Sequence, residues 1–353
     1  MPKRFWFVLL VPFCLALTFI AHQNAAATER WFSMGIYRIW TETYGRVFGY
    51  LPFSVSQFLI ILLPVGAVIY LVYAIWKRQW LKLLANAACT IGILTFLFTM
   101  GAGLNYARLE LAESLGLEVR PSSVAELAAL TETLVQQANE LSAQVSRNEQ
   151  GQMVIAARSY TALSAQAREI FRAAGDDIPL LRGFVPHTNP IVYSHFMSRL
   201  RITGIYSPFT LEPHVNVHVL DYHIPAVMLH ELAHFRGIMR EDEANFIAWL
   251  VGKDSGNPCF MYSSAMLALS YASNALHRAS RTEHARVMAE LNNYVRLDRH
   301  ANWEYWQQFT GPLAEVSQAV NDAYLRANQQ EDGVQSYGRV VDLLLAYHRV
   351  GML

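Results

Sequence analysis

Three long apolar runs constrain the fold of this chain more than any other feature. They cover residues 5–21, 55–76 and 83–104, and none of them contains a charged side chain. Each run approaches the roughly 20 residues that a helix needs to cross the hydrocarbon core of a bilayer. The sequence therefore predicts a membrane region over 1–104 with about three transmembrane helices, followed by a second domain over 105–353.

The composition agrees with this division and narrows the range of partners. Hydrophobic residues make up 53% of the 353 positions, charged residues only 16%, and the formal net charge is zero. Such a low charged fraction favours a membrane protein. Without clustered lysine and arginine there is no basis to expect nucleic acid as a partner. The only cysteines, Cys14, Cys89 and Cys259, predict no disulfide framework.

The basic residues next to the apolar runs predict their orientation. Lys3 and Arg4 precede the first run, whereas Lys77, Arg78 and Lys82 occupy the short connection between the second and third runs. Basic residues close to transmembrane ends stay in the cytoplasm. The three runs would then alternate in direction, and everything after about residue 105 would lie outside the cytoplasm.

The N-terminal region leaves two alternatives open. The small residues of "NAAATER" offer a cleavage site after Ala27, so residues 1–27 are either a retained helix or a cleaved signal peptide. The later runs keep their orientation in both cases. Residues 22–54 mix aromatic and charged side chains, which suits a helix at the membrane interface or a loop that packs on the second domain.

The second domain is predicted to be mainly α-helical. Only residues 214–220, "HVNVHVL", alternate in strand fashion, and they precede the most distinctive motif of the chain. Apolar residues recur at helical spacing in eight segments: 122–147, 156–174, 225–237, 241–252, 260–279, 281–309, 313–328 and 335–350. The expected fold is therefore a set of transmembrane helices followed by an α-rich domain with one short β segment.

The segment "LHELAHF", residues 229–235, predicts a metal site. On a helix, His230 and His234 are four residues apart and so project from one face. Two imidazoles in that position can take two corners of a tetrahedral zinc site. Glu231 points about 100° away from His230, too far round to share the metal comfortably. It is therefore the predicted general base, acting on a water activated by one zinc ion per chain.

The residues after this helix predict the remaining parts of the site. Gly237 suits a left-handed stop, after which a second helix can return Glu241 to the metal as third ligand. Asn245 lies one turn further on the same face and could orient a liganding histidine through its free ring nitrogen. Glu243 competes with Glu241, but the two are about 200° apart on a helix. Only one of them can face the metal.

Several segments together resemble a bacterial family, the uncharacterised membrane proteins of domain-of-unknown-function family 3810. The resemblance implies a zinc metallopeptidase in a bacterial cytoplasmic membrane, crossing it several times with its C-terminal domain outside. One departure is that Pro213 and His214 stand where the family pattern has Ala-Asn. Besides the HELAH motif, the resemblance rests on four segments: "LPFSVSQFL" (51–59), "GIYSPFTLEPHVNV" (204–217), "REDEANFIAWL" (240–250) and "YSSAMLALSYASNAL" (262–276).

More distantly, the HExxH motif followed by ExxAN is similar to thermolysin-like peptidases. That resemblance implies a zincin-like domain in which a strand ahead of the zinc helix pairs with an extended substrate, here "HVNVHV". It also implies the roles of five residues: zinc ligands His230, His234 and Glu241, general base Glu231, and supporting residue Asn245.

The function that these patterns favour is a membrane-anchored zinc metallopeptidase acting on a peptide or protein. Its transition state needs an electrophilic donor, and the candidates are Tyr206, Tyr262, Tyr271 and His277. The candidate contacts to transition state or substrate are Tyr206, Asn216 and Tyr262. Two rival functions remain. One is a zinc hydrolase of a peptidoglycan amide or lipid ester, and the other is a non-enzymatic sensor or assembly factor stabilised by zinc. The sequence predicts no oligomeric state.

Overall fold

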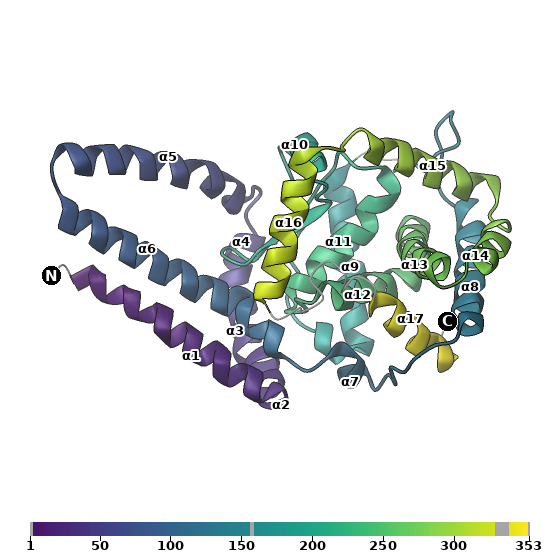
Figure 1. Ribbon diagram of the computed structural model, residues 1–353, viewed down its shortest axis with the longest axis horizontal. Coiled ribbons are helices and arrows are strands. Elements are labelled where there is room, and N and C mark those ends of the chain that lie inside the picture. Colours follow the sequence, from purple (N-terminus) through teal and green to yellow (C-terminus); the bar gives the residue numbers. More distant parts are fainter. Residues whose placement is uncertain (1–2, 156–158, 329–338, 352–353) are drawn as a thin grey trace. The chain divides into compact units, whose positions relative to one another are not determined.

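The computed structural model describes residues 3–155, 159–328 and 339–351. These residues are mainly helical with one small sheet, which confirms the predicted mainly α-helical fold (Figure 1). The chain divides into two compact units. The first contains Met1–Leu109, Tyr206–Glu212 and Phe235–Gly237, and the second contains Glu110–Ile205, Pro213–His234 and Ile238–Leu353.

Three helices of the first unit are long and apolar enough to cross a membrane. They cover Lys3–Gln23, Val55–Trp76 (α5) and Trp80–Gly101 (α6), so the three predicted spans are confirmed as apolar helices. The third begins three residues earlier than expected. The first consists of a 3₁₀ segment, η1 (Lys3–Leu9), that continues into α1 (Leu10–Gln23).

Between the first and second spans, the chain is helical rather than a loop. Two of its segments are wound as π-helix, a geometry that is rare beyond single turns. In chain order the elements are α2 (Ala25–Ala27), η2 (Thr28–Ile36), α3 (Tyr37–Trp40), η3 (Thr41–Gly45) and α4 (Arg46–Gly49). A short 3₁₀ helix, η4 (Gly103–Ala107), follows α6.

The start of α5 is held by a buried carboxylate from far along the chain. Glu212 accepts hydrogen bonds from the backbone N–H groups of Val55 (2.9 Å) and Ser56 (2.8 Å). Ser54 caps the same turn by accepting from Gln57 N. A negative charge is favourable at a helix N-terminus, where backbone N–H groups lack intrahelical partners. The "LPFS" and "PFTLE" segments therefore form one structural feature.

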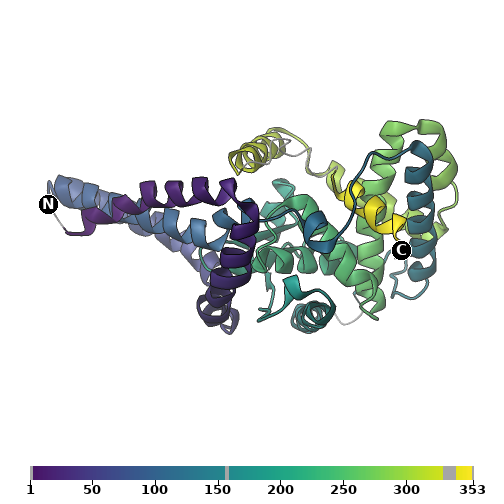
Figure 2. The ribbon, with the colours of Figure 1, turned by 90° about the horizontal axis from the view of Figure 1, so that it is seen from below.

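The second unit is built around α13 (Pro258–Ala279), which packs most extensively on α8 and α12. The helices α8 and α13 lie side by side in both views (Figures 1 and 2). The other helices of this unit are α7 (Leu111–Leu115), α8 (Val124–Ser142), α9 (Tyr160–Asp177), η5 (Pro179–Leu181), α10 (Ser194–Arg199), η6 (Asp221–His223), α11 (Ile224–Phe235), α12 (Glu241–Lys253), α14 (Arg281–Met288), α15 (Asn293–Gln307), α16 (Pro312–Ala327) and α17 (Arg339–Arg349).

The single helix expected over 281–309 is wrong, because α14 and α15 are separate. The break falls at Asn292, whose side chain caps α15 by accepting from Val295 N and donates to Asn139 O on α8. Asparagine competes with the backbone in this way and so favours helix starts. The helices expected over 156–174 and 335–350 begin on residues outside those described, and their described parts start at Tyr160 and Arg339.

The sheet has three short strands, β1 (Asn189–Pro190), β2 (Gly204–Ser207) and β3 (Glu212–Val215), in the order β1-β3-β2. Strand β1 runs parallel to β3. The strand expected over 214–220 is therefore wrong in its bounds, since only its first two residues belong to β3. The chain turns at Asn216, which bonds through its side chain to Ile202 O and His218 N.

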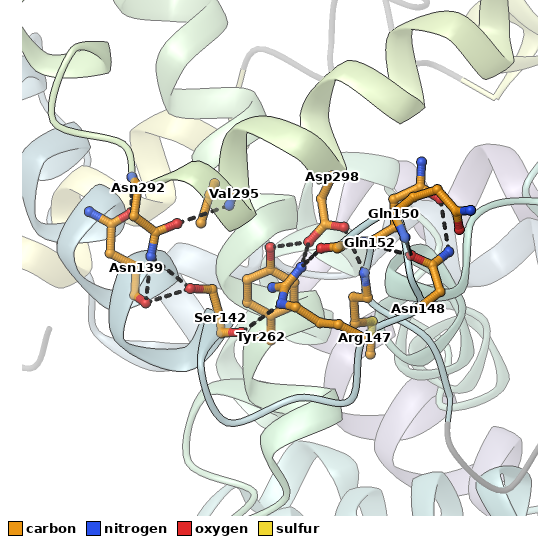
Figure 3. A network of polar contacts seen from close by, with 12 residues as sticks. Asn139, Ser142, Arg147, Asn148, Gln150, Gln152, Tyr262, Asn292, Val295 and Asp298 are labelled. Carbon is orange, nitrogen blue, oxygen red and sulfur yellow. Dashed lines mark hydrogen bonds and ion pairs between the residues drawn. The ribbon is translucent and has the colours of Figure 1, made fainter.

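A buried polar network fixes the loop after α8 to the helices around it (Figure 3). Asp298 of α15 accepts from Arg147 Nη1 (3.0 Å), from the Tyr262 hydroxyl and from Met153 N (2.8 Å). The Asp298 side chain is only 1% exposed. A buried carboxylate is stable only with such partners, so this network stabilises the unit's structure.

Candidate metal centre

The helix that carries the HELAH motif ends as expected at Gly237. Helix α11 is followed by Gly237 in a left-handed conformation, with φ of 83°. The N–H of Ile238 then bonds to the carbonyl of Ala233 at 3.1 Å. This is the six-to-one bond of a Schellman motif. The turn reverses the chain within a few residues, so that α12 begins at Glu241.

This reversal brings two histidines and one carboxylate together. Glu241 Oε2 lies 3.3 Å from His230 Nε2, and Glu241 Oε1 lies 3.5 Å from His234 Nε2. One ligand atom from each residue lies within 4.8 Å of the others, and no other such group occurs in the described part of the chain. Ligands about 2.05 Å from a tetrahedral zinc ion are about 3.3 Å apart. The spacing therefore fits three ligands of one ion.

The hydrogen bonding of His234 also suits a cation. Its Nδ1 lies 2.7 Å from the carbonyl oxygen of Ile238, which can only accept, so Nδ1 carries the hydrogen. A neutral His234 then points the Nε2 lone pair at Glu241, which is another acceptor. A proton or a cation is needed between them. Burial lowers the pKa of His234, but the hydrogen bond and charge of Glu241 outweigh it and raise this pKa to about 9.

The surroundings of His230 favour the neutral form of its ring, which is the form that binds metal. Burial, followed by the neighbouring His234, lowers its pKa. Among the described residues its Nδ1 atom has no hydrogen-bond partner. A hydrogen bond with the Asn245 amide raises the His230 pKa and so offsets part of this lowering. Asn245 Nδ2 also donates to the backbone carbonyl of Glu241 at 2.8 Å. The structure thus brings Asn245 to the cluster and ties it to the third ligand's backbone.

Glu243 points elsewhere. Its Oε1 accepts from the backbone N–H of Leu111 at 2.7 Å and pairs with Arg240 Nη1 at 3.0 Å. Burial raises the pKa of Glu241, but hydrogen bonds from both histidines outweigh it and lower this pKa. Of the two acidic residues that the sequence offers, Glu241 is therefore the one that joins the histidines.

Glu231 lies beside the cluster, and its carboxylate is almost completely buried. It is 3% exposed, and its Oε2 atom has no hydrogen-bond partner within the described residues. Burial raises the pKa of Glu231 to about 8, although His234 opposes this. A buried carboxylate without full hydrogen bonding is costly. Strongly shifted acids next to a cluster of charged groups are typical of functional sites.

Tyr206, one of the predicted contacts, belongs to the first unit. Its hydroxyl donates to Gly101 O at 3.2 Å and lies 3.1 Å from the hydroxyl of Tyr37. Tyr37 itself is fully buried and donates to the carbonyl of Phe235. These contacts give Tyr206 a structural role within the first unit.

The remaining predicted contacts are engaged in other parts of the second unit. The Tyr262 hydroxyl donates to Asp298 in the network of Figure 3. Asn216 uses its whole amide to shape the turn after β3. The exposed His277 lies edge-on to His284, with ring centroids 4.8 Å apart. None of these three side chains shares a described hydrogen bond with the metal-ligand cluster.

Two buried tyrosines do respond electrostatically to the site. Burial raises the pKa of Tyr160, and the charge of Glu231 adds to the rise; burial and Glu241 do the same for Tyr271. Tyr160 donates its hydroxyl to Thr188 Oγ1 at 2.9 Å. Tyr271 was a predicted donor, whereas Tyr160 was missed. It lies about 70 residues before the motif, and no local pattern marks it.

The fold and this cluster define a class: a helical protein with three helices that could cross a membrane and a candidate three-ligand metal centre. The model of the family described as "Protein of unknown function (DUF3810)" matches residues 32–345, so the chain belongs to this family, as the sequence motifs predicted. No curated protein and no solved structure matches the chain.

Proposed function

We propose that this protein is a membrane-anchored, zinc-dependent metallopeptidase. The observation that carries the proposal is the convergence of His230, His234 and Glu241 next to Glu231, a buried carboxylate with an unpartnered oxygen. Three protein ligands leave one position open, as in catalytic rather than structural zinc sites. A structural site has no need of a second carboxylate beside its ligands.

The chemistry would divide between the ion and Glu231. Zinc held by these three side chains supplies Lewis acidity, which lowers the pKa of water and polarises a carbonyl. Glu231 would accept the proton of the attacking water at its unpartnered Oε2 and later deliver it to the leaving nitrogen. Gly204, packed against the other carboxylate oxygen, would hold this base in place.

The sheet suggests where an extended substrate would bind. The predicted pairing strand, "HVNVHV", is unsuitable because β3 is the central strand and both its edges are occupied. Strand β2 lies at an edge and begins at Gly204, next to Glu231. A polypeptide adding to an exposed edge gains main-chain hydrogen bonds that do not depend on its sequence. A peptide or protein substrate is therefore favoured over a compact small molecule.

The basic residues favour a location of the site on one side of the membrane. Lys3 and Arg4 precede the first span, and Lys77 and Arg78 follow the second. Retention of both clusters in the cytoplasm would leave the second unit outside it. We therefore propose a bacterial cytoplasmic membrane as its location, with the lipid bilayer and an extracytoplasmic polypeptide as partners. Labelling of a single cysteine introduced at Glu169 in intact cells tests this orientation.

The function is tested by zinc content and peptide hydrolysis of the detergent-purified full chain. Wild type is compared with Glu231→Gln, using a peptide library of mixed sequence. Glu169→Gln, a change on the exposed face of α9, serves as the matched control. About one zinc per chain in all three proteins, with hydrolysis lost only in Glu231→Gln, is the expected result.

The other outcomes discriminate between the rival functions. Zinc in all three proteins without hydrolysis in any of them would contradict a peptidase that acts alone. It would favour a zinc hydrolase of a non-peptide envelope substrate or a non-enzymatic, zinc-stabilised sensor. A wild-type protein that binds no zinc would overturn the metal assignment itself.

A further inference from the structure

Helix α16 (Pro312–Ala327) carries an apolar stripe that is exposed among the described residues of the second unit. The stripe consists of Leu313, Val316, Val320 and Tyr324, whose exposed fractions are 44%, 60%, 64% and 40%. Their spacing of three, four and four residues places them on one face of the helix. Figure 2 shows α16, in yellow-green, standing clear of the other helices of its unit.

The stripe is not the face that attaches α16 to its unit. Only Ala314 and Leu325 of this helix are buried, and Ser317 donates to the carbonyl of Leu200 at 2.8 Å. At about 100° per residue, Ala314 lies about 160° from Val316 around the helix, and Leu325 lies about 140° from Val320. The stripe and the packed residues are therefore on different faces of the helix, and the charged Glu315, Asp322 and Arg326 lie opposite the stripe.

An exposed apolar row of this kind marks an interaction surface, and three features favour a lipid surface. The same chain carries three helices that could cross a membrane, so a bilayer is a partner to which the second unit would stay tethered. With 16 residues and charged Glu315, Asp322 and Arg326, α16 is too short and too polar to span. A helix with one apolar and one charged face instead lies in the membrane interface.

We propose that α16 is an interfacial helix whose stripe of Leu313, Val316, Val320 and Tyr324 inserts into the bilayer surface. The binding would be apolar rather than electrostatic, since the three charged residues of α16 sum to about −1 and Asp322 pairs with Arg326. The contact would hold one face of the second unit at the membrane. This membrane contact is separate from the proposed peptidase activity and does not depend on zinc.

The test measures lipid contact at two positions of α16 in the full chain. Cys14, Cys89 and Cys259 are replaced by alanine, and a single cysteine is introduced by Val320→Cys or by Glu315→Cys. Glu315 is the matched control because it is exposed on the same helix, about 140° away from Val320, and lies off the face that carries Ala314 and Leu325. Each variant is labelled with an environment-sensitive fluorophore and placed in phosphatidylcholine nanodiscs, with or without nitroxide-bearing acyl chains.

The label at position 320 is expected to be quenched by nitroxide lipid at least about threefold more than the label at 315. Aqueous iodide is expected to quench them in the opposite order. Equal lipid quenching at both positions would overturn the proposal. So would a label at 320 that is protected from both quenchers, because a protein surface would then cover the stripe. Repeating the measurement with Val316→Cys and checking thermal unfolding excludes a local folding defect as the cause.

Discussion

Gly204 packs directly against the carboxylate of Glu231. A Cβ atom at position 204 would lie 2.2 Å from Glu231 Oε1 and 2.8 Å from Val227 Cγ1, closer than real Cβ contacts come. An alanine where strand β2 begins would therefore force the side chains of Glu231 and Val227 to shift. This backbone contact covers one side of the carboxylate and leaves the Oε2 atom of Glu231 without a described partner.

Gly204→Ala should displace the Glu231 side chain and abolish most hydrolysis. The added methyl group overpacks a buried site, which typically costs about 1–3 kcal/mol of stability. Zinc content should be retained, because the three ligands are on other residues. Peptide hydrolysis and zinc content are measured together, with Gly35→Ala as control, where a Cβ meets only an ordinary contact at 3.6 Å. Unchanged hydrolysis in Gly204→Ala would contradict the role of this contact.

The metal-free protein should lose stability as the pH rises. The Glu231 pKa is raised from 4.5 to about 8, so between these values the folded state holds a proton that the unfolded state releases. The free energy of unfolding therefore falls over this range. The pKa of His234, raised from 6.5 to about 9, acts in the same direction, since its stabilisation is complete below 6.5 and is lost through pH 9.

Glu231→Gln should flatten this pH dependence. At pH 8 the metal-free variant is expected to be more stable than wild type by on the order of 4 kcal/mol, with the difference shrinking toward pH 5. This difference in stability is measured by thermal unfolding of chelator-treated protein in detergent. If the stability of the variant depended on pH as strongly as that of wild type, Glu231 would be ionised in the folded, metal-free protein.

Glu241→Gln and Glu243→Gln should have opposite effects. The first removes a carboxylate that faces both histidines and is expected to reduce zinc affinity at least about a hundredfold. The second weakens the contacts with Leu111 and Arg240 and should lower stability by about 1–3 kcal/mol while zinc remains bound. Zinc titration and thermal unfolding separate the two. Zinc loss in Glu243→Gln alone would reverse the ligand assignment.

Gly237→Ala should weaken zinc binding, whereas Gly256→Ala should not. Both glycines have positive φ, at 83° and 67°, so each alanine costs about 1–2 kcal/mol of backbone strain. Only Gly237 forms the turn between the histidines and Glu241. A Cβ there would also press on Asn105 and Tyr37 at about 3.0 Å. Equal zinc affinities in the two variants would show that the site tolerates distortion of this turn.

Tyr271→Phe should lower hydrolysis by about 10–100-fold without releasing zinc, if its hydroxyl assists the reaction. Tyr262→Phe serves as the comparison, because its hydroxyl belongs to the buried Asp298 network. That variant should lose about 1–2 kcal/mol of stability and keep its rate per folded molecule. A Tyr271→Phe protein with full activity would remove Tyr271 from the reaction.

The features that the sequence predicted best depend on short spacings. Residues 55–76 are predicted and found as one helix, because a run of uncharged apolar residues needs no distant partner to be helical in a membrane. His230 and His234 share a face through helix geometry alone. Gly237 ends that helix because a residue without Cβ adopts positive φ at little cost.

Tertiary contacts decided the features that the sequence left open or predicted wrongly. The helix expected over 281–309 breaks at Asn292 because that side chain also bonds to α8. The segment after Val215 turns instead of extending because Asn216 finds partners on neighbouring segments. Each of these side chains has a local alternative of similar energy, and a distant contact selects between the two.

The sequence by itself determined the three apolar helices, the helical second unit and the two histidines with Glu231 beside them. Only the tertiary structure decided that Glu241 rather than Glu243 faces the histidines, since Leu111 and Arg240 hold Glu243 elsewhere. It also placed Gly204, 27 positions before Glu231, against that carboxylate. Helical spacing relates residues within a turn or two, whereas residues tens of positions apart meet only through packing of the whole chain.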